Sequence, residues 1–310
     1  MNLSNHRILV AGGGGFVGSH LVERLIADGN EVVVADDFST GRREWVDDRA
    51  ETIEVDLTSY EAVADVISPD YDFLFHLASR SDPNDNDPRG QFSENTAVTH
   101  NILQAACDSG VTNVAFTSSS TVYGEAPRPT PEDYAPLEPI SVYGASKMAD
   151  EGLLSTYAHS YGFSVWNFRF ANVVGPRLRG AVIPDFIEKL HANRSTLTIL
   201  GNGRQEKSYL HVSDCVEAMC HAIEHSAAGP IHTYNLGTRT TTSVDRIANI
   251  VADVLGVDPE YEYTGGDRGW PGDVPRMRLS TEKLSALGWA PRMESDVAVR
   301  AAAEELANEL

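Results

Sequence analysis

Short apolar runs alternate with amphipathic segments over the first half of the chain. The first apolar run, Arg7–Ala11, is followed by the amphipathic run Ser19–Asp28. Continuous apolar runs of this length are typical of strands buried on both faces of a parallel sheet. The same pattern predicts further strands at Glu31–Asp36, Ile53–Leu57, Phe73–Ser79 and Asn113–Ser118, and a helix at Phe92–Ser109. The predicted fold class is therefore α/β, with a doubly wound parallel sheet.

The pattern becomes less regular in the second half. A long helix is predicted at Tyr143–Tyr161 and a strand at Ser164–Phe170. Beyond them the pattern predicts helices at Ile183–Ala192, after Asp214, at Val244–Leu255 and within 280–310, and strands at Leu197–Leu200 and Tyr234–Gly237. The chain has no internal repeat and no low-complexity linker, so we expect a smaller C-terminal lobe that is interleaved with the first rather than a separate domain.

Charge narrows the possible partners. The 310 residues carry 45 acidic side chains and a formal net charge of −21, and only four of the basic residues are lysines. Nucleic-acid binding needs a basic surface, and anionic headgroups would repel this chain, so neither nucleic acid nor membrane is an expected partner. An acidic, lysine-poor composition also resembles proteins of salt-accumulating halophiles, in which high salt screens the self-repulsion. An acidic mesophilic protein is the alternative.

The termini and cysteines indicate a cytoplasmic protein. No apolar run is long enough to span a bilayer, and the polar stretch before Arg7 leads directly into a strand without the features of a signal peptide. Cys107, Cys215 and Cys220 have neither metal-ligand spacing nor an obvious pairing. We therefore expect free thiols in a reducing cytoplasm and no metal site.

A glycine-rich turn connects the first strand to the first helix. Gly12, Gly15 and Gly18 form a G-x-x-G-x-x-G motif between Arg7–Ala11 and the following amphipathic run. Glycine lets the backbone approach a ligand closely, and a helix N-terminus offers free N–H groups and a positive dipole end to phosphates. The strand, turn and helix in this order predict a site for a dinucleotide pyrophosphate.

Acidic residues after the next two strands refine the cofactor. Asp36 ends its strand about twenty residues after the motif, where a carboxylate can bind the adenosine ribose hydroxyls and repel a 2′-phosphate. Asp56 ends the third predicted strand, where it can accept from an adenine amino group. The cofactor is therefore predicted to be NAD, although Arg42 and Arg43 follow closely and leave NADP as the alternative.

A Tyr and a Lys four residues apart form the candidate proton-transfer site. Tyr143 and Lys147 lie on one face of the predicted helix, one turn apart. Tyr has a pKa near ~10, and a neighbouring ammonium would draw that pKa toward neutrality. Ser118, Ser119 and Ser120 end an apolar strand and offer a hydroxyl partner. By contrast, His76 lies within an apolar strand and is predicted to be a satisfied core histidine.

Together these motifs resemble the extended short-chain dehydrogenase/reductase superfamily, and within it the NAD-dependent nucleotide-sugar epimerases and dehydratases, most of all the UDP-glucose 4-epimerases. The matching segments cover almost the whole chain. They are the glycine loop, Asp36, Asp56-Leu57, His76-Leu77-Ala78, Ser118-Ser119-Ser120, Tyr143–Lys147, Arg169–Arg177, Tyr209–Asp214 and Leu287-Gly288-Trp289. The resemblance implies a Rossmann-type sheet in an NAD-binding domain, 1–175 with a returning segment near 209–240. It also implies a nucleotide-sugar-binding lobe, 176–208 and 241–310.

The resemblance also implies site residues by position. Catalysis would use Tyr143 as base, Lys147 on the nicotinamide ribose and Ser119 as hydroxyl partner, with Ser118 and Ser120 as rivals. NAD would contact Gly12, Gly15, Phe16, Val17, Gly18, Asp36, Asp37, Asp56, Leu57, Leu77, Ala78, Ser79, Asn95, Tyr143 and Lys147. The nucleotide sugar would contact Ser119, Ser120, Asn172, Leu200, Lys207 and Arg268. The polar loop 81–90 is a further candidate for substrate contact.

The implied reaction is a 4-epimerisation of a UDP-hexose through a transient 4-keto sugar. Tyr143 would take the 4-hydroxyl proton while hydride passes to bound NAD and back to the other face. Ser120-Thr121 replaces the acidic pair of the dehydratases, and Lys207 replaces the family's usual Arg. The alternatives are an epimerase of N-acetylhexosamine or uronate nucleotides, and a nucleotide-sugar reductase or decarboxylase. A homodimer formed through Phe92–Ser109 and Tyr143–Tyr161 is also implied.

Overall fold

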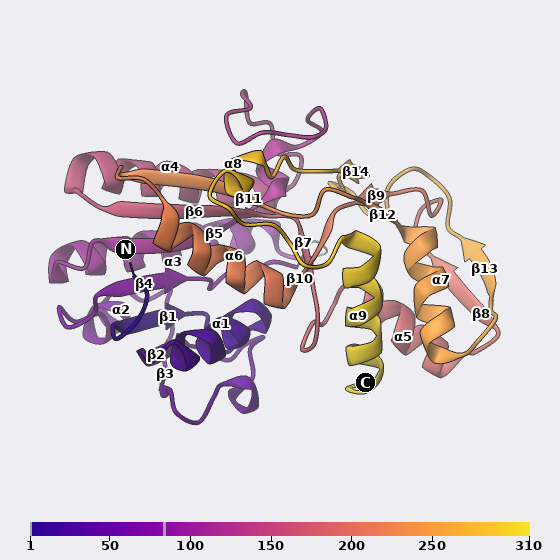
Figure 1. Cartoon of the computed structure of the whole chain (residues 1–310), viewed down its shortest axis with the longest axis horizontal. Coiled ribbons are helices and arrows are strands. Elements are labelled where there is room, and N and C mark those ends of the chain that lie inside the picture. The colour runs from indigo at the N-terminus through magenta and orange to yellow at the C-terminus, as the bar shows by residue number, and fades with distance from the viewer. Residues whose placement is uncertain (1, 83–84) are drawn as a thin grey trace. The chain divides into compact units, whose positions relative to one another are not determined.

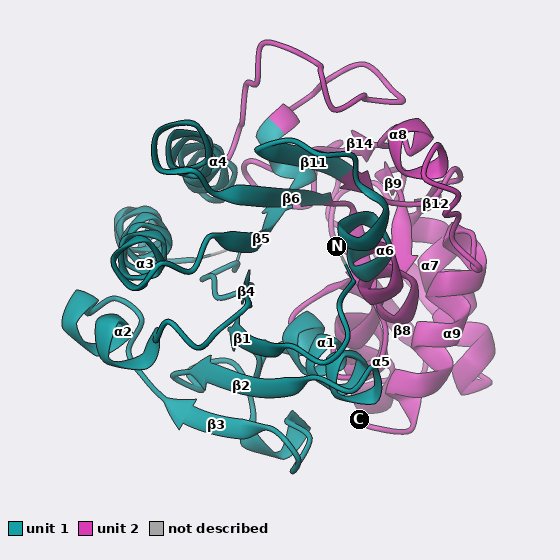
Figure 2. Cartoon of the chain, turned by 60° about the vertical axis from the view of Figure 1, so that its left-hand side comes forward, with its two compact units in different colours: residues 1–122, 142–169, 219–234 teal, residues 123–141, 170–218, 235–310 magenta. Residues whose placement is uncertain are grey.

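The computed structural model describes residues 2–82 and 85–310, and the chain folds as two compact units that interleave along the sequence (Figures 1 and 2). The first unit contains residues 1–122, 142–169 and 219–234, and the second contains 123–141, 170–218 and 235–310. The segments 123–141 and 170–175, and both ends of the returning segment (209–218 and 235–240), were expected in the first domain but lie in the second unit. There Thr130 forms a β-bridge with Leu279, and β7 (Asn172–Val174) pairs in parallel with β10 (Tyr209–His211).

A seven-stranded sheet forms the centre of the first unit, in the order β11-β6-β5-β4-β1-β2-β3. The strands are β1 Arg7–Ala11, β2 Glu31–Asp36, β3 Glu51–Glu54, β4 Phe73–His76, β5 Asn113–Ser119, β6 Ser164–Phe170 and β11 Ile231–Leu236. The pairs from β5 through β3 are parallel, with Ala11 opposite both Ala35 and His76. The order of strands reverses between β1 and β4, and ligands bind at this point in open α/β sheets.

Helices cover both faces of this sheet. Figure 2 shows α2 (Tyr60–Val66), α3 (Pro88–Ser109) and α4 (Val142–Tyr161) on one face and α1 (Phe16–Ala27) on the other. The predicted doubly wound α/β fold is thereby confirmed. Its buried core includes fully covered side chains such as Leu9, Phe116 and Leu154. The core therefore fixes α4 against β5, the two elements that carry the candidate catalytic residues.

Two helices of the first unit begin earlier than the sequence pattern predicted. α1 starts inside the glycine motif at Phe16 rather than at Ser19. α3 starts at Pro88 because the Asp87 side chain caps it by accepting from the Gly90 N–H at 2.9 Å. Of the polar loop 81–90, Pro83 and Asn84 lie outside the described residues.

The second unit is built from short strands and four helices in the described ranges. Its strands are β7, β8 Thr196–Ile199, β9 Glu206–Lys207, β10, β12 Thr242–Ser243, β13 Glu260–Tyr263 and β14 Arg276–Met277. Its helices are α5 Val182–Ala192, α7 Val244–Leu255, α8 Glu282–Ser285 and α9 Ser295–Ala307, and α6 (Val212–His225) begins in it. Its own apolar core joins α5, α7 and α9 around side chains such as Phe186, Ile247 and Val299.

Candidate active site

The glycine turn fits a dinucleotide backbone in geometry. A Cβ on Gly12 would lie 2.4 Å from the Ala78 nitrogen, and one on Gly18 would lie 2.1 Å from the Gly12 oxygen, so neither position admits a side chain. A Cβ on Gly15 would meet only the Gly12 oxygen, at 3.4 Å. The turn is therefore tightly packed on its inner side and open at Gly15, where a phosphate group can approach.

The N-terminus of α1 is suited to an anion. Gly15 is its N-cap, no side chain caps it, and its first turn carries no acidic residue. The first-turn N–H groups, which belong to the predicted contacts Phe16, Val17 and Gly18, therefore remain available to an acceptor. These features fit the pyrophosphate of NAD.

Asp36 ties the end of β2 to the glycine turn. Its carboxylate accepts from the Gly14 N–H and from the Phe38 N–H, both at 2.8 Å, and its side chain is buried. Burial raises the pKa of Asp36, and the two backbone hydrogen bonds oppose that shift. A carboxylate oxygen can accept more than one hydrogen bond, so Asp36 can still accept from ribose hydroxyls.

The neighbouring polar residues at this edge are engaged locally. Asp37 accepts from the Ser39 backbone and hydroxyl, and Asp56 accepts from the Thr58 backbone and hydroxyl, which lowers the pKa of Asp56. Asp56 lies in the turn after β3, which ends at Glu54 rather than at Leu57 as predicted.

Arg42 and Arg43, which made NADP the alternative cofactor, both pair with carboxylates. Arg42 lies 3.6 Å from Glu44, and Arg43 pairs with Glu54. Each guanidinium also lies over an aromatic ring, Arg42 over Trp45 and Arg43 over Phe38. This arrangement favours NAD over a cofactor with a 2′-phosphate.

The end of β4 is held against α3 and α4 by Asn95. Leu77 and Ala78 both donate to the Ala11 carbonyl, at 2.8 and 3.0 Å. The buried Asn95 amide accepts from the Arg80 N–H at 2.8 Å and donates to the Ser146 hydroxyl at 3.1 Å. Asn95 therefore connects the segment after β4 to α4. Direct contact with NAD stays a prediction for Leu57, Leu77, Ala78, Ser79 and Asn95.

The three serines at the end of β5 have different surroundings. Ser118 is buried and donates to Glu151 at 2.6 Å. Ser119 is less buried and accepts from the Thr121 hydroxyl at 3.0 Å, and Ser120 begins the 3-10 helix Ser120–Tyr123. Because Ser118 is committed to Glu151, this arrangement favours Ser119 or Ser120 as the reactive hydroxyl.

Tyr143 and Lys147 lie one turn apart on α4, as predicted. Lys147 is 2% exposed, and its Nζ lies 4.6 Å from the Phe116 ring centroid and 5.8 Å from the Tyr143 ring centroid. Burial lowers the pKa of Lys147 to about 8, while the carboxylates of Asp150 and Glu151 oppose that shift.

The expected lowering of the Tyr143 pKa is not found. Burial, followed by the Asp150 carboxylate, raises the pKa of Tyr143, and only a hydrogen bond with Ser79 opposes the shift. Desolvation of the phenolate is thus the largest influence on this pKa. In this state Tyr143 is a protonated phenol at neutral pH.

In the second unit, Lys207 forms an ion pair with Asp273. Lys207 Nζ lies 2.5 Å from Asp273 Oδ1 and 5.0 Å from the Trp270 ring centroid. The Asp273 side chain is 2% exposed, and its other oxygen accepts from the Gly269 N–H at 2.9 Å. Sequence reasoning missed Asp273 and Trp270, although the turn Trp270-Pro271-Gly272-Asp273 was visible.

The other predicted substrate residues of the second unit lie in several elements. Arg268 pairs with Glu125 and donates to the Asp273 carbonyl, so the structure brings it together with Lys207. Asn172 lies in β7, opposite Tyr209 of β10. Leu200 is 45% exposed, and its carbonyl accepts from Gln205.

Known proteins identify the family. Residues 8–237 match the model of the NAD dependent epimerase/dehydratase family. The chain belongs to this family. A UDP-glucose 4-epimerase of Mycolicibacterium smegmatis is 35% identical over 301 residues, which cover 93% of this chain and 94% of that protein.

Solved structures agree with this membership. A crystal structure of a UDP-galactose 4-epimerase has a TM-score of 0.91 and 45% identity, covering 98% of this chain and 99% of that chain. The UDP-glucose 4-epimerase of Thermotoga maritima, crystallised with UDP-glucose, has a TM-score of 0.90 and 30% identity over 98% and 99% of the two chains. These findings confirm the predicted NAD-dependent epimerase, its cofactor and its Rossmann-type fold.

The described residues of this epimerase contain neither a membrane-spanning helix nor a cluster suited to a metal ion. None of the helices that the structure describes is long and apolar enough to cross a membrane. Within residues 2–82 and 85–310, no group of three or more His, Cys, Asp or Glu side chains is arranged to hold a metal ion.

Proposed function

We propose that this protein is an NAD-dependent nucleotide-sugar 4-epimerase that interconverts UDP-glucose and UDP-galactose. The observation that carries the proposal is the buried Tyr143–Lys147 pair on α4, in the same compact unit as the open glycine turn and Asp36. The 45% identity to a UDP-galactose 4-epimerase over nearly the full length supports this choice of substrate.

Tyr143 is the base of the proposed reaction. The phenol of Tyr143 must first release its own proton, and the resulting phenolate then takes the proton of the sugar's 4-hydroxyl. When bound, NAD would accept the hydride from the same carbon and return it. The 4-keto sugar turns over and receives the hydride on its opposite face, while Tyr143 returns the proton to oxygen. Lys147 supplies a positive charge beside the phenolate, and Ser119 donates a hydrogen bond to the reacting oxygen.

The proposed NAD contacts are made by the start of α1, Asp36 and Lys147. The N-terminus of α1 would hold the pyrophosphate, Asp36 would hold the adenosine ribose, and Lys147 would hold the nicotinamide ribose. The open side of Gly15 and the uncapped first turn support this assignment.

The nucleotide end of the substrate is assigned to the second unit. Lys207, Arg268 and Asn172 bind the diphosphate, and Leu200 and its neighbouring backbone hold the uracil. The clustering of Lys207 and Arg268 around Asp273 supports the first assignment. Binding energy from this remote part positions the reacting carbon without fixing the hexose, which must turn over.

The test is direct conversion. The protein is incubated in molar salt with UDP-galactose and, separately, with UDP-N-acetylgalactosamine, and the 4-epimers are separated by chromatography. We expect conversion of UDP-galactose, and its loss in Tyr143→Phe. Failure to convert UDP-galactose with NAD still bound would overturn the proposal, and conversion of the N-acetylated sugar alone would move it to that substrate.

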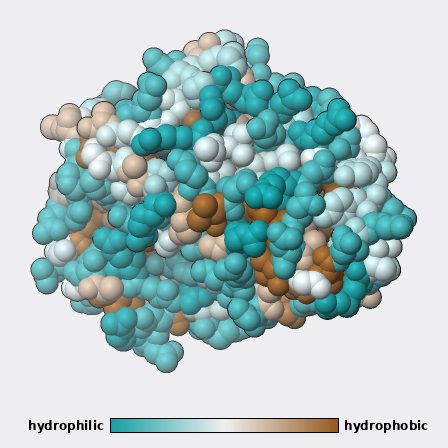
Figure 3. Space-filling view, turned by 45° about the vertical axis from the view of Figure 1, so that its right-hand side comes forward, coloured by the Kyte–Doolittle hydropathy of each residue, from teal (hydrophilic) through white to brown (hydrophobic). Residues whose placement is uncertain are grey.

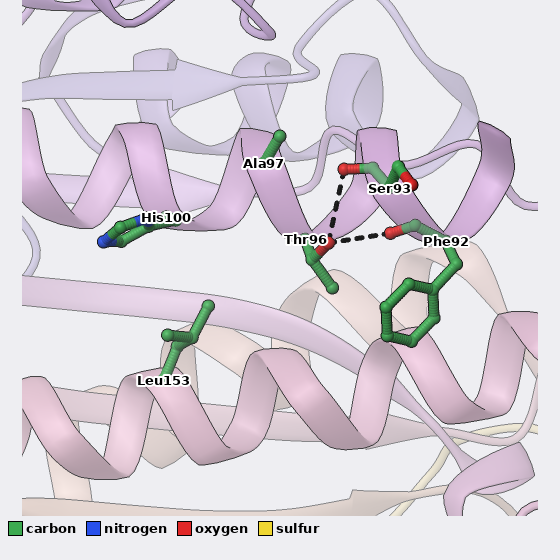
Figure 4. Close-up of a pocket in the computed structure, with 6 residues that line it drawn as sticks. All are labelled: Phe92, Ser93, Thr96, Ala97, His100 and Leu153. Carbon is green, nitrogen blue, oxygen red and sulfur yellow. Dashed lines mark hydrogen bonds between the residues drawn. The ribbon is translucent and has the colours of Figure 1, made fainter. Parts of the chain in front are cut away.

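We also propose that two copies pair through α3 and α4. Phe92, Ser93, Thr96, Ala97 and His100 of α3 and Leu153 of α4 line a groove of about 350 Å³ (Figure 4). The Thr96 hydroxyl bonds to the carbonyls of its own helix, so it does not need water in the groove. The exposed apolar side chain of Phe92 in this groove supports a partner at this surface.

Measurement of the molar mass in solution tests the pairing. We expect a dimer by light scattering, and a monomer for Phe92→Glu combined with Leu153→Glu. A monomer for the unchanged protein, or a dimer that survives both substitutions, would contradict it.

We also propose that the protein is cytoplasmic and adapted to high salt. The free cysteines and the net charge of −21 support it, and the face in Figure 3 is mostly hydrophilic. We expect unfolding midpoints to rise steadily from 0.1 M to 2 M KCl as the acidic surface is screened. A midpoint that does not change over this range would contradict the salt adaptation.

A further inference from the structure

A buried carboxylate lies one turn beyond the catalytic lysine and takes no part in the proposed reaction. Asp150 is on α4, three residues after Lys147 and seven after Tyr143, so all three share one face of the helix. It is 1% exposed. Neither of its oxygens has a hydrogen bond of ordinary geometry with any described residue.

The surroundings of Asp150 offer little compensation for this burial. From α3, the Thr99 hydroxyl faces the carboxylate closely enough to lower its pKa, and on its other side Thr99 lies 3.0 Å from His76 Nε2 of β4. His76 Nδ1 is itself buried without a described partner. Burial lowers the pKa of His76 to about 3, with the Lys147 charge adding to the shift, so His76 is neutral and gives Asp150 no counter-charge.

The neighbouring charged side chains, Glu151 and Arg169, are already paired with each other. Glu151, next to Asp150, forms an ion pair with Arg169 of β6 at 2.7 Å and accepts from Ser118. Lys147 is therefore the cation left for Asp150. No direct ion pair joins the two within the described residues, so the interaction acts through space in a low-dielectric interior.

The electrostatic effects are mutual. Burial raises the pKa of Asp150 to about 6, and Lys147 is the largest influence that lowers it. Asp150 is in turn the largest influence that raises the pKa of Lys147. Between about pH 6 and about pH 8 the cluster therefore holds an anion and a cation, and each stabilises the charge of the other in a site whose burial disfavours both.

We propose that Asp150 is a positioning residue that keeps Lys147 protonated in its buried site at neutral pH, so that α4 presents a cation beside Tyr143. Without this carboxylate, the desolvated ammonium would release its proton near neutral pH. A neutral lysine could not stabilise the phenolate of Tyr143. The importance of this charge for catalysis rests on the proposed function, whereas the charge state of Lys147 does not.

The scarcity of lysine makes the test direct. The chain has only Lys147, Lys189, Lys207 and Lys283, so carbon-13 labelling of the lysine side chains gives few NMR signals to follow against pH. The signal lost in Lys147→Met identifies Lys147. Asp150→Asn keeps the shape of the side chain and removes its charge. In this variant we expect the pKa of Lys147 to fall by about one unit or more.

Two further variants complete the experiment. Thr99→Val removes the hydroxyl that favours the Asp150 anion, and we expect a smaller fall of the Lys147 pKa. Asp65→Asn removes the same charge from an exposed position of α2 and should leave the pKa unchanged. An unchanged or higher Lys147 pKa in Asp150→Asn, with or without lower thermal stability, would overturn the proposal.

Activity provides an independent check. If the protein epimerises UDP-galactose, the alkaline limb of the kcat/KM profile should move to lower pH in Asp150→Asn, because the substitution removes a carboxylate that raises the pKa values of both Lys147 and Tyr143. A uniform loss of activity with an unmoved limb would indicate a purely structural role and contradict the proposal. If the unchanged protein converts no sugar, the proposed function fails while the NMR titration still decides the role of Asp150.

Discussion

Arg169 and Glu151 form a bidentate, nearly buried ion pair that is joined to Ser118 by a hydrogen bond. Arg169 Nε lies 2.9 Å from Glu151 Oε1, and Arg169 Nη2 lies 2.7 Å from Oε2. The two side chains are only 8% and 11% exposed. Because Ser118 also donates to Glu151, the pair connects β6 and α4 to the end of β5.

Removal of one partner should be costly. Glu151→Gln leaves the Arg169 charge buried without its carboxylate, so we expect the free energy of unfolding in urea to fall by about 3 kcal/mol. Asp253→Asn breaks the exposed pair between Asp253 and Arg300, 65% and 42% exposed, and should cost less than about 1 kcal/mol. Equal losses in the two variants would show that burial does not strengthen the inner pair.

Two glycines of the turn should fail in different ways. An alanine at Gly18 would place its Cβ 2.1 Å from the Gly12 oxygen, so Gly18→Ala should lose more than about 2 kcal/mol of stability. An alanine at Gly15 meets only one atom, at 3.4 Å, so Gly15→Ala should fold normally. Its methyl group, however, stands where the pyrophosphate must approach.

Retained NAD separates these effects. After gel filtration, NAD released by acid from each protein is quantified enzymatically. We expect Gly15→Ala to keep its unfolding midpoint and lose most of its NAD. Full NAD content in Gly15→Ala would place the pyrophosphate elsewhere.

His76 should make the protein less stable in mild acid. Burial lowers its pKa to about 3 in the folded protein, against about 6.5 when unfolded, so the unfolded chain binds a proton first as pH falls. The stabilisation is complete above pH 6.5 and declines between pH 6.5 and 3. At pH 5.5 the loss is about 1.4 kcal/mol relative to neutral pH.

A variant without this imidazole isolates the effect from other titrating groups. The drop in the free energy of unfolding between pH 7.5 and 5.5 should be about 1.4 kcal/mol smaller for His76→Gln than for the unchanged protein. His159→Gln, which changes an exposed histidine of α4, should follow the unchanged protein. The same pH dependence in all three proteins would show that His76 can be protonated within the fold.

Lys207 should contribute to substrate binding rather than to the chemical step. Lys207→Met removes a cation assigned to the diphosphate, so KM for UDP-galactose should rise about tenfold or more with little change in kcat. Lys207→Arg should restore most of the affinity. The matched control is Lys189→Met, because Lys189 pairs with Asp185 at 2.6 Å on α5. A fall in kcat at unchanged KM would contradict the assignment.

The sequence predicted the strands of the sheet and the helices α1, α3 and α4, because their apolar runs and amphipathic periods are long enough to recognise. The seven-residue helix α2 was missed. The run Arg7–Ala11 and the helix after it emerged with only small errors at their ends. Strands of two or three residues, such as β7 and β9, show no such period and were missed. The start of α3 was also missed, since it is set by the Asp87 cap rather than by apolar spacing.

The candidate site was predictable where local spacing carries the chemistry. Tyr143 and Lys147 are neighbours by helix geometry, and Gly12 and Gly18 by the turn. The environment of these residues was not predictable, because it depends on distant segments. Burial, which depends on the segments packed against α4, raises the pKa of Tyr143, and the Asp150 carboxylate adds to that shift. Asp273 pairs with Lys207 from 66 residues away in the sequence.

The central claim is that hydride leaves and returns to the same sugar carbon with Tyr143 as base. UDP-galactose carrying deuterium at C4 is incubated with the protein in ordinary water, and the UDP-glucose formed is isolated and analysed by mass spectrometry and NMR. We predict that the product keeps its deuterium at C4, and that Tyr143→Phe forms little or no product. UDP-glucose with hydrogen from water at C4 would contradict the hydride mechanism. If no UDP-glucose forms at all, the proposed epimerase activity itself is contradicted.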